Sequence, residues 1–215
     1  TLDEGAASKD APVFFGGINV YLQQKFALFR HTPRWVDRLF DAPALLRMVG
    51  KFSGMTGGSE IGELTHSMLL GEEGRQVKEL EQLVAWLKHE KPDAIWLSTA
   101  LLVGLARRIR EEVGVPVFCS LQGEDSFLDS LTAPWNERCW ATLSERARDV
   151  AAFVAPSRYF GELMGGRISL REDQLRVLPN GISLDGYGEP VEPRQPAVIG
   201  FLSRLYHGKG LGLVV

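Results

Sequence analysis

Two basic residues near the end of the sequence are spaced to bind one anionic group. The apolar run at 198–202 indicates a strand, and Arg204 follows it closely. Lys209 lies between Gly208 and Gly210, where a helical pattern begins. A guanidinium and an ammonium aimed at one point suit a diphosphate, because both donate charge-assisted hydrogen bonds to phosphate oxygens. The alternative is that both side chains are solvated on a loop.

A glycine pair near the beginning is a second candidate for anion binding. Gly16 and Gly17 precede an apolar-periodic run that contains Ile18, Tyr21, Leu22 and Phe26. Glycines at a helix start let backbone N–H groups approach an anion, and the helix dipole favours negative charge there. A plain tight turn explains the same pair equally well, so the pair gains weight only together with other motifs.

A third group of polar residues follows an apolar run at 115–121 that indicates a strand. The group comprises Gln122, Gly123, Glu124 and Asp125. The carboxyl ends of strands in an open α/β sheet face the ligand crevice. Amide and carboxylate side chains beside a glycine suit a polar substrate such as a sugar hydroxyl. The competing interpretation is a loop in which Asp125 caps the next helix.

These candidates need a sheet that brings strand ends together, and the sequence predicts one. Strand and helix patterns alternate, which predicts an α/β fold with a parallel sheet, doubly wound with helices on both faces. Expected strands are 94–97, 115–121, 150–155 and 175–178, and expected helices include 77–87, one ending at Gly114, one beginning at Pro134, and one from Ser157 to Gly165-Gly166. Residues 32–74 show no clear periodicity and predict loops and short helices.

A cluster of prolines and glycines at 185–196 predicts a linker, since it suits neither a helix nor a central strand. Pro179-Asn180-Gly181 just before it reads as a turn that leads out of the first domain. We therefore expect a first domain at 1–184 and the beginning of a second, truncated α/β domain at 197–215. One strand and part of a helix cannot bury their own apolar faces.

Composition limits the function classes. The 215 residues carry a formal net charge of -3, with 45% hydrophobic and 24% charged residues. This is typical of a soluble globular protein and argues against nucleic acid as the main partner. Cys119 and Cys139 lack metal or redox spacing and are expected to be free, buried thiols. No run is apolar enough to span a membrane, and we expect a cytoplasmic protein that can contact the inner membrane face peripherally.

Taken together, the motifs resemble glycosyltransferase family 4 of the GT-B fold, in which two Rossmann-like domains face each other. That family has a Gly-Gly turn, a His-Gly-x-Asp-like loop, a Ser-Arg helix start, a Pro-Asn-Gly-Ile-x-x-Asp stretch and a Gly-x-x-x-Arg…Lys-Gly stretch. The corresponding residues here are Gly16-Gly17, Gln122 to Asp125, Ser157-Arg158, Pro179 to Asp185, and Gly200 to Gly210.

The resemblance implies transfer of a hexosyl-type group from a nucleoside-diphosphate sugar to an acceptor hydroxyl with retention. Arg204, Lys209 and Gly17 would stabilise the leaving diphosphate, and Gln122 and Asp125 would lie near the reacting sugar or acceptor. The acceptor would be a saccharide, a lipid or a small molecule. No cofactor and no metal are implied, and the sequence has no Asp-x-Asp motif.

Three departures from the family pattern bear on activity. Gln122 stands where the family often has His, and it cannot carry a proton as imidazole does. The family's Glu-containing donor motif lies beyond Val215, so residues 1–215 alone are expected to be inactive. The strand expected before Gly16 is also missing, because 1–12 reads as polar and irregular.

Other functions on the same scaffold stay open, because a fold does not fix a reaction. A sugar-nucleotide epimerase or a phosphorylase is one, and a non-catalytic sugar-binding domain is another. A dinucleotide-dependent oxidoreductase is disfavoured, since no G-x-G-x-x-G follows a strand. A P-loop nucleotidase fails because Gly208-Lys209-Gly210 lacks the following Ser or Thr.

Overall fold

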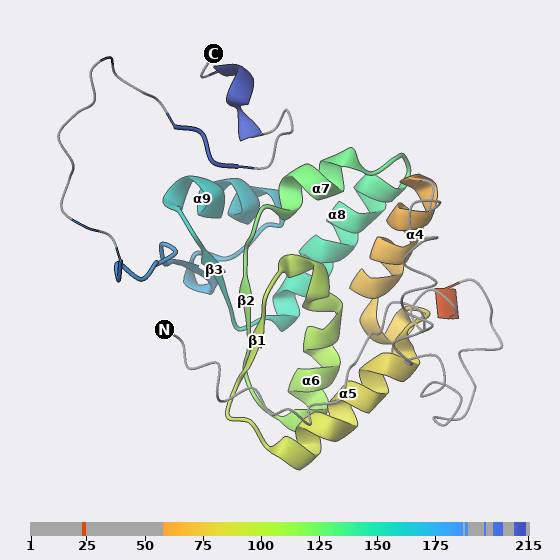
Figure 1. The fold of residues 1–215 in the computed structure, drawn as a ribbon. Helices are drawn as coiled ribbons and strands as arrows, with labels where there is room; N and C mark the ends of the chain where they lie inside the picture. The colour runs from red at the N-terminus through yellow and green to blue at the C-terminus, as the bar shows by residue number, and fades with distance from the viewer. Residues whose placement is uncertain are drawn as a thin grey trace, which may run out of the picture. The chain divides into compact units, whose positions relative to one another are not determined.

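The computed structural model describes residues 23–24, 58–186, 188, 196, 200–203 and 209–213. The chain divides into two units, Thr1–Asn180 and Gly181–Val215. The first unit holds the sheet and six α-helices of the described residues (Figure 1). The second unit has one short 3-10 helix, η9 (Leu211–Leu213), in its described part. The domain limits 1–184, 185–196 and 197–215 stay predictions.

The first unit is built on a four-stranded parallel sheet in the order β1-β2-β3-β4. The strands are β1 (Ile95–Leu97), β2 (Val117–Ser120), β3 (Ala152–Ala155) and β4 (Leu175–Val177). The α-helices are α4 (Gly58–Leu69), α5 (Val77–Glu90), α6 (Ala106–Val113), α7 (Glu124–Ser130), α8 (Trp135–Arg146) and α9 (Arg158–Arg167). Short 3-10 helices are η4 (Gly71–Glu73), η5 (Ala100–Leu105), η6 (Ala147–Asp149) and η7 (Glu172–Gln174). The predicted α/β fold with a parallel sheet is confirmed.

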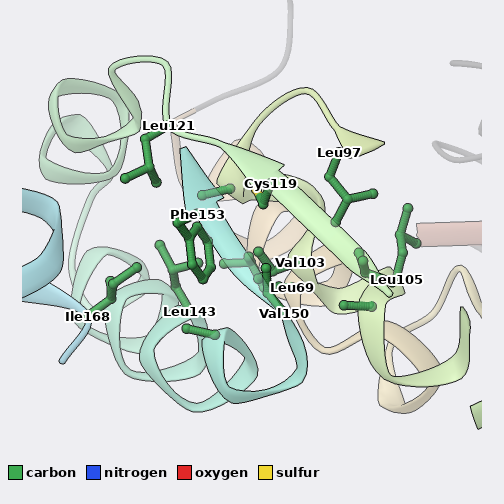
Figure 2. Close-up of a cluster of buried hydrophobic side chains, with 14 of the residues drawn as sticks. Leu69, Leu97, Val103, Leu105, Cys119, Leu121, Leu143, Val150, Phe153 and Ile168 are labelled. Carbon is green, nitrogen blue, oxygen red and sulfur yellow. The ribbon is translucent and has the colours of Figure 1, made fainter. Parts of the chain in front are cut away.

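One face of the sheet carries the core. Side chains alternate between the two faces of a strand, and Leu97, Cys119 and Phe153 all point to the buried face. Figure 2 shows them packed with Val103 of η5 and Leu143 of α8. The strand residues on the opposite face are more exposed to solvent: Trp96 is 56% exposed, and Phe118 and Val154 are half-buried. The expected cover of helices on this second face stays a prediction.

Two predicted helix ends follow from local chemistry. Gly114 ends α6 in the left-handed conformation at φ 78°, which costs glycine little because it has no Cβ. The Ser157 hydroxyl accepts a hydrogen bond from the Phe160 backbone N–H at 3.2 Å and caps α9. Helix α9 ends at Arg167, one residue after the predicted stop at Gly165-Gly166. Burial of Ile168, which bonds back to the Met164 carbonyl at 3.0 Å, extends the last turn.

The segment at 32–74, predicted as loops and short helices, contains a twelve-residue helix, α4, in its described part. The glycines of α4 weaken its helical pattern in the sequence, so the helix was not predicted. Two close backbone contacts just after α4 require glycine: a Cβ on Gly71 (φ +62°) would lie 2.0 Å from the Gly104 carbonyl oxygen, and one on Gly104 would lie 2.3 Å from the Met68 carbonyl oxygen. The turn after α4 therefore packs directly on η5, backbone against backbone.

None of the helices in the described ranges is long and apolar enough to cross a membrane.

The core prediction is tested at Phe153, which is fully buried in the centre of the sheet. Phe153→Ala should lower the free energy of unfolding by about 3 to 5 kcal/mol, because it removes a large side chain and leaves a cavity. Tyr159→Ala is the control, since Tyr159 is 76% exposed and should change stability by less than about 0.5 kcal/mol. Chemical denaturation of both variants measures the difference. Equal effects would contradict the assigned core.

A second prediction concerns pH and His66, through which α4 contacts α8. Its Nε2 lies 3.1 Å from Thr142 Oγ1, and its ring centroid lies 5.8 Å from that of Trp135. Burial, and then the charge of Arg138, lower the pKa of His66 below its usual 6.5. Protonation therefore disfavours the folded state, and His66 should cost stability as the pH falls below 6.5.

The His66→Gln variant should lose less stability than the natural protein between pH 8 and pH 5. Urea unfolding at both pH values measures this difference. His89→Gln is the matched control, because the His89 side chain is 86% exposed. A His66→Gln variant with the same pH dependence as the natural protein would contradict the proposed burial effect.

Candidate functional site

The candidate site lies at the carboxyl edge of the sheet, where four loops emerge. Because the strands are parallel, the loops after β1, β2, β3 and β4 share this edge. They begin with Ser98-Thr99, Leu121-Gln122, Pro156-Ser157 and Leu178-Pro179. Hydroxyl and amide groups dominate the exposed part of the first three, which suits binding of a polar ligand.

Glu124 connects the first two of these loops through its buried carboxylate. The residue is only 3% exposed. Its Oε1 accepts hydrogen bonds from Thr99 Oγ1 at 2.7 Å and from the Ala100 N–H at 2.8 Å. Its Oε2 accepts one from the Gln122 N–H at 2.8 Å. A buried carboxylate is tolerated when such donors satisfy it, so Glu124 fixes the spacing of the two loops.

Gln122 and Gly123 form the exposed tip of the loop after β2. The Gln122 backbone is held by Glu124, while its side chain is exposed. Gly123 precedes α7 at φ 96°, a left-handed conformation that other residues rarely adopt. This turn leaves the Gln122 amide facing solvent on a fixed backbone. The predicted sugar contacts of Gln122 and Gly123 stay predictions.

The two acidic residues of the motif are placed differently. The Glu124 carboxylate is occupied by three protein donors, so its contribution in this structure is to hold the loops. Asp125 is half-buried in the first turn of α7. The Asp129 carboxylate raises the pKa of the Arg167 guanidinium in α9, and the charge of Asp125 adds to that effect. Direct sugar binding by Glu124 and Asp125 stays a prediction.

The residues predicted to bind the diphosphate lie elsewhere in the chain than the loop after β2. Gly16, Gly17 and Arg204 lie outside the described residues. Lys209 is described within the second unit, and it is exposed. Whether these four residues meet around one anion stays a prediction.

A groove of about 420 Å³ lies between α9 and β4. Gly161, Gly165, Leu175 and Val177 line its apolar part, and Arg158 is among its charged residues. None of the residues from Gln122 to Asp125 lines it. The groove is therefore separate from the loop that the motifs single out.

Sequence reasoning missed the part played by Thr99. Its hydroxyl donates to Glu124, and the same oxygen accepts from the Leu101 N–H at 3.4 Å, which caps η5. A signal was present, since Ser98-Thr99 follows an apolar strand pattern just as Gln122 does. The sequence alone did not show that a carboxylate 25 residues further on would join the two loops.

The cysteines are free and buried, as predicted. Burial raises the pKa of Cys139 to about 11 and raises that of Cys119 further, so neither thiol forms the reactive thiolate readily. Among the residues that the structure describes, no three His, Cys, Asp or Glu side chains are grouped so that they could hold a metal ion.

Comparison with known families agrees with the α/β fold. The family model described as a Glycosyl transferase 4-like domain matches residues 56–181, more than half of the 215 residues. The chain belongs to this glycosyltransferase family, and the suspected membership of family 4 is confirmed. Neither a curated protein nor a solved structure matches the chain significantly.

The Glu124 carboxylate gives a direct test of the loop geometry. Glu124→Gln should lower the free energy of unfolding by about 2 to 3 kcal/mol, because the amide NH₂ would face an N–H or O–H donor. Glu111→Gln is the matched control, since Glu111 is exposed and should change stability by less than about 0.5 kcal/mol. Thermal and urea unfolding measure both. A silent Glu124→Gln would show that the three hydrogen bonds do not hold the loops.

Proposed function

We propose that the natural full-length protein transfers a sugar from a nucleoside-diphosphate sugar to an acceptor hydroxyl, with retention at the anomeric carbon. The observation that carries this proposal is the family match over 56–181, which includes the exposed Gln122-Gly123 turn at the carboxyl edge. A rigid edge loop with an outward amide is a suitable place to bind sugar hydroxyls.

The chemistry rests on stabilising the leaving group. As the glycosidic bond to the diphosphate breaks, negative charge develops on the β-phosphate oxygens. Arg204 and Lys209 would neutralise that charge, and the backbone N–H groups at Gly16 and Gly17 would donate from the other side. The acceptor hydroxyl forms the new bond on the same face of the sugar, and its proton leaves with the diphosphate.

Gln122 and Asp125 would hold the transferred sugar and the acceptor. The Gln122 amide can donate and accept hydrogen bonds, which suits a sugar hydroxyl, but it cannot move a proton. Asp125 can accept a hydrogen bond from an acceptor hydroxyl. Gly123 and Glu124 would act beside them, with Glu124 holding the Gln122 backbone in place. Positioning of this kind accounts for a large part of rate enhancement in transfer reactions.

The proposal implies a nucleotide sugar as donor and a saccharide, a lipid or a small molecule as acceptor. It requires neither a cofactor nor a divalent metal. We place the reaction in the cytoplasm, with peripheral membrane contact where the acceptor is a lipid.

A second candidate function follows from Gln122. An amide in place of the imidazole that the family often uses favours a domain that binds sugar without turnover. Epimerisation of the donor sugar is the other enzymatic alternative. Both differ from transfer in their products, so one assay distinguishes all three.

The assay incubates the full-length protein with a panel of labelled nucleotide sugars and candidate acceptors. We expect release of nucleoside diphosphate together with a retained anomeric configuration in the glycoside, read by NMR, and the same rate after treatment with EDTA. A changed donor sugar without transfer would support the epimerase. Saturable binding without any product would support the non-catalytic domain and contradict our proposal.

The basic pair is tested by donor binding. Arg204→Ala combined with Lys209→Ala should weaken nucleotide-sugar affinity at least about 100-fold, because two charge-assisted contacts to the diphosphate are lost. Arg148→Ala is the control for a change in charge, since Arg148 is exposed in the first unit. Calorimetry measures the affinities and circular dichroism checks the folds. Unchanged donor affinity in the double variant would count decisively against this assignment.

A further inference from the structure

The helix that follows the candidate loop is held at both ends by carboxylates. Helix α7 has seven residues, too few for a helix to be stable by itself in water. Glu124, its first residue, is bonded to the loop after β1. Asp129, in its last turn, is bonded to Arg167 at the end of α9. The direction of α7 therefore depends on its tertiary contacts.

The contact at Asp129 is a three-part brace formed by Asp129, Arg167 and Trp140. Arg167 donates from both terminal nitrogens to the two carboxylate oxygens of Asp129, at 2.7 and 2.9 Å. Trp140 of α8 donates its Nε1–H to Asp129 Oδ1 at 2.9 Å. The Arg167 guanidinium also lies 4.2 Å from the centroid of the Trp140 ring.

This brace is more specific than an ordinary surface ion pair. A two-pronged Arg–carboxylate contact fixes both side chains in a plane, and stacking on an indole adds a cation–π attraction. The side chains of Arg167 and Asp129 are 37% and 49% exposed, so solvent screens part of the attraction. The hydrogen bond that the Trp140 indole donates to Asp129, together with the stacked guanidinium, joins α7, α8 and α9 at one point.

Asp125 lies on the same side of α7 as Asp129. Residues four apart in a helix are neighbours on one face. The Asp125 carboxylate is close enough to Arg167 for its charge to help raise the pKa of that guanidinium, after the larger effect of Asp129. Arg167 donates both of these hydrogen bonds to Asp129, and its link to Asp125 is through charge.

We propose that Arg167, held by Asp129 and Trp140, is a positioning residue for Asp125 on the acceptor side of the site. It fixes the direction of α7 and leaves the Asp125 carboxylate available to an acceptor hydroxyl. This inference rests on the proposed function, in which Asp125 contacts the sugar or the acceptor. In this proposal, the Arg167 guanidinium positions Asp125 without contacting the substrate.

The test uses the full-length protein and three variants. Arg167→Gln removes both the positive charge and the two-pronged contact with Asp129, whereas Arg167→Lys keeps the charge and loses the two-pronged geometry. Asp129→Asn removes the negative charge of the same contact. Arg171→Gln is the matched control, because Arg171 is an exposed arginine of the same unit that pairs with Asp173 at 3.0 Å. Steady-state kinetics give KM for donor and acceptor separately, and amide hydrogen exchange follows α7 with α5 as the internal reference.

We expect Arg167→Gln and Asp129→Asn to raise the acceptor KM about three- to tenfold, with the donor KM changed less than about twofold. Arg167→Lys should recover part of the loss. Exchange at 125–130 should become about three- to tenfold faster in both variants and stay unchanged in α5. Arg171→Gln should behave as the natural protein. An equal rise in both KM values would indicate a general structural defect and overturn the proposal.

The two measurements separate this proposal from the function on which it rests. Unchanged exchange at 125–130 in both variants would overturn the brace, whatever the kinetics show. Faster exchange with an unchanged acceptor KM would overturn the link to Asp125. If the natural protein transfers no sugar from any donor, the proposed function fails and the role toward an acceptor fails with it, while the exchange data still decide whether the brace holds α7.

Discussion

One buried carboxylate organises the carboxyl edge of this sheet. Glu124 is taken out of water almost completely, and a buried charge is costly unless donors surround it. Here the donors are the Thr99 hydroxyl and the backbone N–H groups of Ala100 and Gln122, which belong to two different loops. The loops after β1 and β2 therefore hold a fixed spacing. This spacing sets the positions of the exposed Gln122 amide and of the start of α7.

This arrangement links folding to the proposed chemistry. The core on one face of the sheet, centred on Phe153 and Leu143, sets the strands in register. The strand ends then present their loops together, and Glu124 joins two of them. Helix α7 extends from that junction to the brace at Asp129, so its acidic face is supported from both ends. Under the proposed function, such supports would orient a sugar without large rearrangement.

Much of the fold could be predicted from the sequence because its signals are local. The apolar run at 94–97, the left-handed end at Gly114 and the cap at Ser157 each act within a few residues, and the structure has them as expected. Helix α4 was missed because its glycines weaken the pattern, and α9 was predicted too short because burial of Ile168 outweighs two glycines.

The site was predictable only in part, for a physical reason. A polar loop after a strand is visible in sequence, so Gln122 to Asp125 could be singled out. Which carboxylate turns inward depends on partners 24 and 25 positions away, and nothing local distinguishes Glu124 from Asp125.

A crystal structure of the full-length protein with donor and acceptor bound would test whether the loop held by Glu124 binds the sugar. We expect the transferred sugar within hydrogen-bonding distance of Gln122 or Asp125, with Glu124 still hydrogen-bonded to Thr99, Ala100 and Gln122. A sugar bound instead in the groove between α9 and β4, with the Gln122 loop empty, would contradict it.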